Sequence, residues 1–555
     1  MDAMSPSAYS PGHRMRPPWH LFAVAALAGG CGSPPLPAPP DRLHLAPNEI
    51  PLTVEKSCPG GPDCADIGDG KLYAGEARRE ITPTVEPFVD LNGDGVHEDG
   101  EPYADLNHNG RFDPVWMAGY HTGLQAFGVH DPNWTRCYAL RQNQTTLVHC
   151  VLDVVGLMHD ELEAIRADLD PALGIDYFMT SATHVHETKD SIGIWGPDYA
   201  TSGYDPDWMA ILHARTVEAA TEAVHNLRPA KLSIGSILVE DPGHHMEPYI
   251  SDSRDPVVID NRLHLLQLDG EDGKPIVTII NWASHPEGAG DGNRYTSSDY
   301  VHYLRESVER GTGSDVVFIS AALGGQIGPN RIQPVTDDGR VVTERGLPFA
   351  DAWGNSVARF ALRAFAARTP VDSPRLAFRT TRFNVHIDNT SFHLAARLHL
   401  FHRQFFGYNP KLPSVGANAP VIDTEMAYIT LGPAAIITCP GELLPELFIG
   451  GYDGSRAGAW PFLDPMDIAP PDVAEAPPPP YLFDFMGGDP DSRMVFGLTL
   501  DFVGYIIPRY NFVLDEDAPY IAQAPGDHYE ETNSLGPRAE PEIVGTMRQL
   551  VSGGR

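Results

Sequence analysis

Apolar residues recur along this chain at two spacings, which predict strands alternating with helices from about residue 71 onward. Short runs rich in β-branched and aromatic residues predict strands over 146–155, 231–238, 263–268, 316–320 and 425–438. Longer amphipathic runs predict helices over 159–169, 207–226, 298–310 and 350–367. We therefore expect one large α/β or mixed α+β domain over residues 71–555.

Two segments break this alternation and are expected to be insertions. Residues 454–490 are rich in Pro, Asp and Gly and include a polyproline run at 477–480, which predicts a long surface loop. Residues 90–113 begin with a match to the twelve-residue calcium loop, with Gly95 at its sharp turn. The side chains expected to bind calcium are Asp90, Asn92, Asp94, Glu98 and Glu101.

A second, incomplete copy of this loop begins at Asp105 and has Trp116 in place of the final Glu. A solvated acidic turn is the alternative interpretation of the segment. Because no strong helix flanks it, we expect the calcium to be structural and the loop not to act as a sensor.

The first thirty residues have the pattern of an export signal. An apolar run over 21–30 follows Arg14 and Arg16 and is too short to span a bilayer. Small residues precede Cys31, which predicts a lipoprotein signal peptide over 1–30 with lipid on Cys31. A plain secretory signal with an incidental cysteine is the alternative.

Residues 31–70 are rich in Pro and Gly, which predicts a stiff tether between the lipid and the domain. We expect an exported protein, anchored by lipid to a bacterial membrane on its periplasmic or cell-surface side. The chain has 74 acidic and 39 basic residues and a formal net charge of −35. Nucleic acid is therefore excluded as an expected partner, because no basic patch could overcome that field.

Four cysteines suggest disulfides, as export allows. Cys137 and Cys150 flank a segment with the pattern of a hairpin that turns near residues 143–144. A symmetric turn there sets the two cysteines opposite each other, close enough for a cross-strand disulfide. Cys58 and Cys64 bracket a Gly/Pro-rich loop and could close a second bridge.

Histidines stand directly after two strand-like runs. His184 and His186 follow residues 177–180, and His285 follows residues 276–280. A histidine at a strand end is held rigidly, as zinc requires, because the imidazole nitrogen must meet the metal at ~2.0–2.1 Å from a fixed direction. The pattern favours a metal-dependent hydrolase.

Several sequence blocks occur in a fixed order from about residue 71 to the C-terminus. They are Glu-Ile-Thr-Pro at 80–83, Met-Ala-Gly-Tyr at 117–120, Ser-Ala-Thr-His-Val-His at 181–186, Asn-Trp-Ala-Ser-His at 281–285, Ser-Asp at 298–299, Pro-Gly-Glu at 440–442, Gly-Leu at 497–498 with Gly-Tyr at 504–505, and His-Tyr-Glu at 528–530. Together these blocks resemble the catalytic domain of the neutral/alkaline ceramidase family.

The resemblance implies a fold of mixed sheets flanked by helices, a bound zinc ion and hydrolysis of an N-acyl amide, with ceramide as the first candidate substrate. Carried over by position, the implied zinc ligands are His184, His285, Glu442 and Tyr505. The resemblance also implies that His186 and Tyr529 act on the oxyanion or on a proton.

Three departures from the family pattern stand out. Gly328 takes the place of a serine that has been proposed as the nucleophile in the family, which leaves attack by zinc-activated water. Residues 187–189 read Glu-Thr-Lys where the family has Ser-Gly-Pro, which is expected to change the rim of the pocket. The sequence is also expected to lack the C-terminal β-sandwich of the family.

Other interpretations stay open at this point. Glu442 alone could cap a helix-like segment, and Tyr505 alone could be a core aromatic residue. The chain could hydrolyse a different amide or an ester with the same zinc. It could also be a non-catalytic surface lipoprotein that calcium stabilises.

Overall fold

The computed structural model describes residues 52–553 except 62–63, 242–246, 330–331, 453–462, 464–465 and 527. The predicted signal peptide, Cys31 and most of the predicted tether lie outside the described residues. The end of that tether is not a free linker, because β1 (Lys56–Cys58) pairs with β17 (Leu376–His386). None of the described helices is both long enough and apolar enough to cross a membrane.

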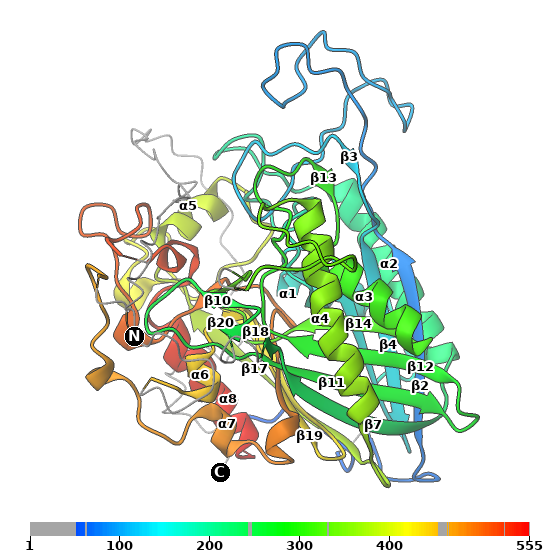
Figure 1. Ribbon diagram of the computed structural model, residues 1–555. Helices are drawn as coiled ribbons and strands as arrows, with labels where there is room; N and C mark the ends of the chain where they lie inside the picture. Colours follow the sequence, from blue (N-terminus) through cyan, green and yellow to red (C-terminus); the bar gives the residue numbers. More distant parts are fainter. Residues whose placement is uncertain are drawn as a thin grey trace, which may run out of the picture.

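The largest sheet has nine strands (Figure 1). Eight of them lie in the order β14-β12-β11-β7-β2-β4-β5-β6, and β16 pairs with β7. Their bounds are β2 (Leu72–Glu80), β4 (Trp134–Gln142), β5 (Thr145–Leu152), β6 (Tyr177–Ala182), β7 (Arg228–Leu238), β11 (Arg262–Gly270), β12 (Pro275–Trp282), β14 (Asp315–Ser320) and β16 (Thr369–Pro370).

The two edges of this sheet, β14 and β6, contact each other. Just beyond β6, the carbonyl of Thr183 accepts a hydrogen bond of 2.9 Å from the Ser320 hydroxyl of β14. The segment at Gly497 and Leu498 joins both edges, because Gly497 N donates to Ser320 O and Ala182 N donates to Leu498 O. The sheet is therefore curled, and the ends of β6 and β12 open toward the same space.

Four helices cover this sheet: α1 (His159–Asp168), α2 (Pro206–His225), α3 (Asp299–Thr312) and α4 (Leu347–Ala367). α2 packs on β2, β4 and β5, whereas α3 and α4 pack on each other and on β7, β11 and β14. Leu266 and Ile279 point into one core and their neighbours Leu265 and Ile280 into another. Burial of both faces explains why these strands read as continuous apolar runs.

A second sheet of five strands has the order β1-β17-β18-β19-β21. The prediction of one strand over 425–438 is wrong, because β18 (Val421–Leu431) and β19 (Ala434–Thr438) form a hairpin. Gly432, with φ of 60°, supplies the turn between them. β21 (Arg493–Phe496) pairs with β19, and α8 (Ala539–Val551) packs on β17 and β18.

Short elements complete the described fold. The strand pairs are β3 (Gly128–Val129) with β13 (Tyr295–Thr296), β8 (Glu240–Asp241) with β9 (Glu247–Pro248), β10 (Ser251–Asp252) with β15 (Gln326–Ile327), and β20 (Glu442–Leu443) with β22 (Tyr505–Ile506). The short helices are α5 (Thr390–Arg397), α6 (Glu446–Ile449) and α7 (Leu482–Phe485). The mixed α/β fold predicted from the sequence is confirmed.

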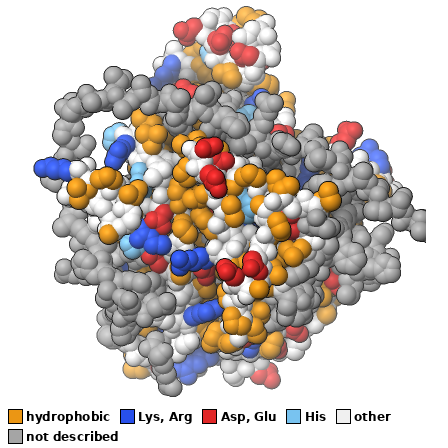
Figure 2. Space-filling view, turned by 90° about the vertical axis from the view of Figure 1, so that its left-hand side faces the viewer, with side chains coloured by type: hydrophobic (Ala, Val, Ile, Leu, Met, Phe, Trp, Pro, Cys, Tyr) orange, Lys and Arg blue, Asp and Glu red, His pale blue; other side chains and the backbone are white. Residues whose placement is uncertain are grey.

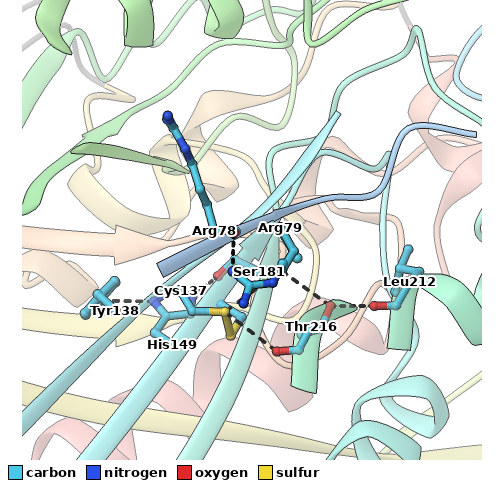
Figure 3. Close-up of a disulfide and its surroundings, with 10 residues drawn as sticks. Arg78, Arg79, Cys137, Tyr138, His149, Ser181, Leu212 and Thr216 are labelled. Atoms are coloured by element: carbon cyan, nitrogen blue, oxygen red, sulfur yellow. Dashed lines mark hydrogen bonds between the residues drawn. A yellow bond between two sulfur atoms is a disulfide. The ribbon is translucent and has the colours of Figure 1, made fainter. Parts of the chain in front are cut away.

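Two disulfides lie within the described residues. Cys137 of β4 lies directly opposite Cys150 of β5, with 4.0 Å between their Cα atoms, and a disulfide joins them (Figure 3). A second disulfide joins Cys58 to Cys64. His149, beside Cys150, is fully buried, and burial lowers its pKa to about 3, so it is a neutral core residue.

Candidate metal centre

The two strand-end histidines face each other. His184 follows β6 and His285 follows β12, and their ring centres are 4.8 Å apart. His184 has a φ of 67°, a left-handed conformation that residues other than glycine rarely adopt. Its backbone N–H donates to the carbonyl of Val154. Such an unfavourable backbone conformation is typical of functional residues held in place by their surroundings.

Backbone carbonyls fix the orientation of both rings. Nδ1 of His184 lies 2.6 Å from the carbonyl oxygen of Val155, and Nδ1 of His285 lies 2.8 Å from that of Gln326. A carbonyl can only accept, so each Nδ1 carries a proton, and each ring turns its Nε2 toward the common space. Metal-binding histidines are oriented in this way.

Glu442 and Tyr505 reach the same space from the short pair β20 and β22, where they lie opposite each other. A carboxylate oxygen of Glu442 is 3.1 Å from Nε2 of His285 and 3.3 Å from Nε2 of His184. The Tyr505 hydroxyl is 3.3 Å from Nε2 of His285. Bonds of ~2.0–2.1 Å in a tetrahedron place ligand atoms roughly 3.3–3.4 Å apart, which these separations fit.

The chemistry of this donor set also fits a cation. Both Nε2 atoms lie within 3.3 Å of a Glu442 carboxylate oxygen, and all three side chains are buried. Burial alone would raise the pKa of Glu442, but His184 and His285 hold it far below its ordinary value. The site therefore keeps an ionised carboxylate in the interior, which is costly unless a cation compensates it.

His186 belongs to the same cluster. Ligand atoms of His184, His186 and His285 all lie within 4.8 Å of one another, and Nε2 of His186 is 3.4 Å from Nε2 of His184. Its Nδ1 is buried and has no partner among the described residues. Gly119 fits against this ring, since a Cβ there would lie 2.3 Å from the His186 ring, and Tyr120 packs edge-on against it.

Tyr529 lies next to Tyr505, the fourth predicted zinc ligand. Its hydroxyl is 2.6 Å from that of Tyr505, and burial raises the pKa of both tyrosines, so both stay protonated. The 528–531 segment is held by the buried Arg254, which donates to both Glu530 and Glu531. Sequence reasoning missed Arg254, because it lies outside every recognisable block.

The expectation that residues 187–189 change the pocket rim is wrong, because all three are buried. Glu187 accepts a hydrogen bond of 3.0 Å from the Tyr120 hydroxyl, and Lys189 pairs with Asp205. These residues lie inside the protein, where they support the Tyr120 side of the site.

The predicted calcium loop forms the knob at the top of Figures 1 and 2, where carboxylates gather. Asp90 accepts hydrogen bonds from the backbone N–H groups of Gly93 and Gly95. Glu101, at the final position of the loop, accepts from Leu91 N and Glu98 N. The remaining predicted calcium ligands, Asn92, Asp94 and Glu98, lie in the same loop, where Asn92 donates to the carboxylates of Asp94 and Glu98.

The second copy of the loop is completed from outside its own sequence. Glu86 accepts hydrogen bonds from Leu106 N and Asp113 N, which are the second and ninth positions of that copy. Glu101 makes the same two bonds in the first copy. The sequence places Trp116 at the end of the second copy, but Glu86 takes the place of the missing glutamate.

Another cluster of metal-ligand types consists of His159, Glu163 and Glu425. Arg166 donates to both carboxylates, and Arg382 donates to Glu163 as well. Two guanidinium groups already neutralise these carboxylates, so the cluster is a structural ion-pair network.

The sequence matches no protein-family model and no curated protein. Among solved structures, the neutral ceramidase from Pseudomonas aeruginosa is similar at a TM-score of 0.59 and 13% identity, covering 88% of this chain and 75% of that one. A ceramidase complexed with C2 is similar at a TM-score of 0.57 and 13% identity, covering 87% of this chain and 75% of that one. This chain therefore has the neutral ceramidase fold.

Proposed function

We propose that this protein is a zinc-dependent hydrolase of N-acyl amide bonds, similar to ceramidases. The observation that carries the proposal is the meeting of His184, His285 and Glu442 in one buried space, where a Glu442 carboxylate oxygen lies 3.1 Å from Nε2 of His285 and 3.3 Å from Nε2 of His184. Tyr505 would complete the ligand set. A zinc ion held there would make a water molecule acidic enough to attack a carbonyl near neutral pH.

The remaining side chains supply proton donors. Tyr529 has a protonated hydroxyl beside Tyr505, so it would donate a hydrogen bond to the carbonyl oxygen as negative charge develops there. His186 would donate to the same oxygen or pass a proton to the departing amine. Gly328 offers no hydroxyl, so the chain has no nucleophilic side chain at that position.

Apolar side chains beside His184 support a lipid-like acyl group. The ring of Phe502 lies 6.0 Å from the ring of His184. Three other half-buried apolar side chains belong to the same cluster: Ile194, Trp195 and Phe401. An acyl chain lying across them would place its carbonyl near the histidines, and ceramide is the first candidate of this class.

We also propose the anchoring and the second metal expected from the sequence. Lipid on Cys31 would hold the exported domain at a bacterial membrane, near an amphipathic substrate. Calcium bound by Asp90, Asn92, Asp94, Glu98 and Glu101 would be structural, because hard cations prefer oxygen ligands.

The test compares fatty-acid release from ceramide, with other amides and esters as further substrates. Wild type supplied with zinc should release fatty acid, and Glu442→Gln should lose both zinc and activity. Glu425→Gln is the matched control, because this buried glutamate pairs with Arg166, away from the candidate ligands. Activity that survives in Glu442→Gln would contradict the proposed site, and release from an ester alone would contradict the amide.

A further inference from the structure

Gly328 and Arg345 fit together beside the candidate metal centre. A Cβ at residue 328 would lie 2.4 Å from one terminal nitrogen of Arg345 and 2.8 Å from the other. The guanidinium therefore covers the position where a larger side chain would begin. A larger side chain at residue 328 would have to displace the guanidinium.

The position of Arg345 is fixed from two further directions. Its guanidinium stacks 4.6 Å from the centre of the Phe349 ring, which is buried. Its Cβ would lie 3.1 Å from a Cβ at Gly290, and the next residue, Gly346, donates to the carbonyl of Gly288. The side chain is thus held between the 288–290 and 326–328 segments.

Both of these segments belong to the surroundings of His285. The 288–290 segment follows His285 in the chain, and Gln326, two residues before Gly328, accepts the hydrogen bond from its Nδ1. Gly328 and His285 are buried, whereas Arg345 is exposed. The guanidinium therefore lies at the surface, next to the segments that position His285.

This guanidinium has no ion pair or hydrogen bond with the described residues. The buried carboxylate of Asp299 feels its charge at longer range, but it already accepts from the N–H groups of Gly288, Ala289 and Tyr300. The described residues leave the planar donor edge open to a ligand, and guanidinium groups match carboxylates and other oxyanions.

We infer that Arg345 binds an anionic group on the amine half of the substrate, so that N-acyl amino acids are favoured over neutral amides. The inference rests on the proposed hydrolase function. The apolar cluster lies beside His184, and Arg345 contacts the segments that follow and orient His285. An amide bound across the centre would therefore direct its acyl chain to the apolar cluster and its amine half to Arg345.

The test compares two amides with the same acyl chain. The amine half of N-lauroylglycine ends in a carboxylate, whereas that of N-lauroylethanolamine ends in a neutral hydroxyl. Wild type should favour the anionic amide in kcat/KM by about tenfold, as expected of a charge-assisted hydrogen bond in a partly exposed site. Arg345→Gln should bring this ratio near one. Gly328→Ala should lower it as well, because the methyl group displaces the guanidinium without removing it.

Arg363→Gln is the matched control, since Arg363 is also exposed and stacks on Phe360 of the same helix, and it should keep the preference. A wild-type ratio near one, or a ratio that Arg345→Gln leaves intact, overturns the inference. If neither amide is hydrolysed, the proposed function fails separately. The Kd of N-lauroylglycine then tests whether Arg345 binds the carboxylate. An equal Kd in wild type and Arg345→Gln overturns the inference.

Discussion

Replacing Arg254 with Met should separate the positioning of Tyr529 from its chemistry. The Arg254 guanidinium is almost fully buried and donates to Glu530 at 2.8 Å and to Glu531 at 3.0 Å and 3.1 Å. A further bond of 2.7 Å reaches the carbonyl of Asn511. Because Glu530 directly follows Tyr529, these bonds fix the segment that carries the phenol.

The structure sets the size of two effects. Removing one partner of a buried ion pair leaves charges uncompensated, so Arg254→Met should lower the free energy of unfolding by about 3–5 kcal/mol. Activity should fall by at most the worth of one oxyanion donor, roughly 10²–10³-fold in kcat. The free energy of unfolding and the kcat of Arg254→Lys should lie between those of wild type and Arg254→Met, because an ammonium cannot span both carboxylates in the same geometry.

The assay measures kcat, KM and zinc content well below the melting temperature, in a cycle with Tyr529→Phe. If Arg254 acts through Tyr529, Arg254→Met should cost little further kcat once the hydroxyl is absent. Arg166→Met is the control, since Arg166 pairs with Glu425 and bonds the carbonyl of Phe178, near the opposite end of β6 from His184. Additive losses of kcat in the cycle would show that Arg254 does not act through Tyr529.

Three further outcomes are expected. Calcium-selective chelation should lower Tm without removing zinc, and Glu86→Gln should reproduce part of that loss; an unchanged Tm would argue against calcium. Gly119→Ala should lower kcat with zinc retained, because the methyl group would overlap the His186 ring; an unchanged kcat would show that this ring position is unimportant. Burial raises the pKa of Asp501, but Arg403 lowers it below its ordinary value. Asp501 therefore stabilises the fold above pH ~4 and less as the pH falls through the folded pKa, and Asp501→Asn should flatten this dependence in acid unfolding curves.

Local patterns were enough to predict elements in which neighbours in sequence decide the structure. α2 and α4 bury one face of a long amphipathic run, so periodicity alone locates them. The β18–β19 hairpin was missed because its turn interrupts an apolar run for only two residues, Gly432 and Pro433. The Gly-Pro pair is itself a turn signal, but the long apolar pattern on both sides of it predicts one continuous strand.

In the site, too, local sequence patterns predict some residues and miss others. Ordered sequence blocks pointed to the residues that meet at the centre, including Glu442 and Tyr505. Arg254 reaches Glu530 across a separation of 276 residues, and Glu86 completes a loop that starts well after it. No local pattern marks such pairs, because only the tertiary fold brings them together.

A zinc titration of metal-free protein that follows fatty-acid release from an N-acyl amide tests the zinc site most directly. We expect no release without metal and a rate that rises until about one zinc per chain is bound. His184→Ala should stay inactive throughout the titration. Full activity of wild type without metal, or no activity at saturating zinc toward any amide, would contradict zinc-dependent amide hydrolysis at this site.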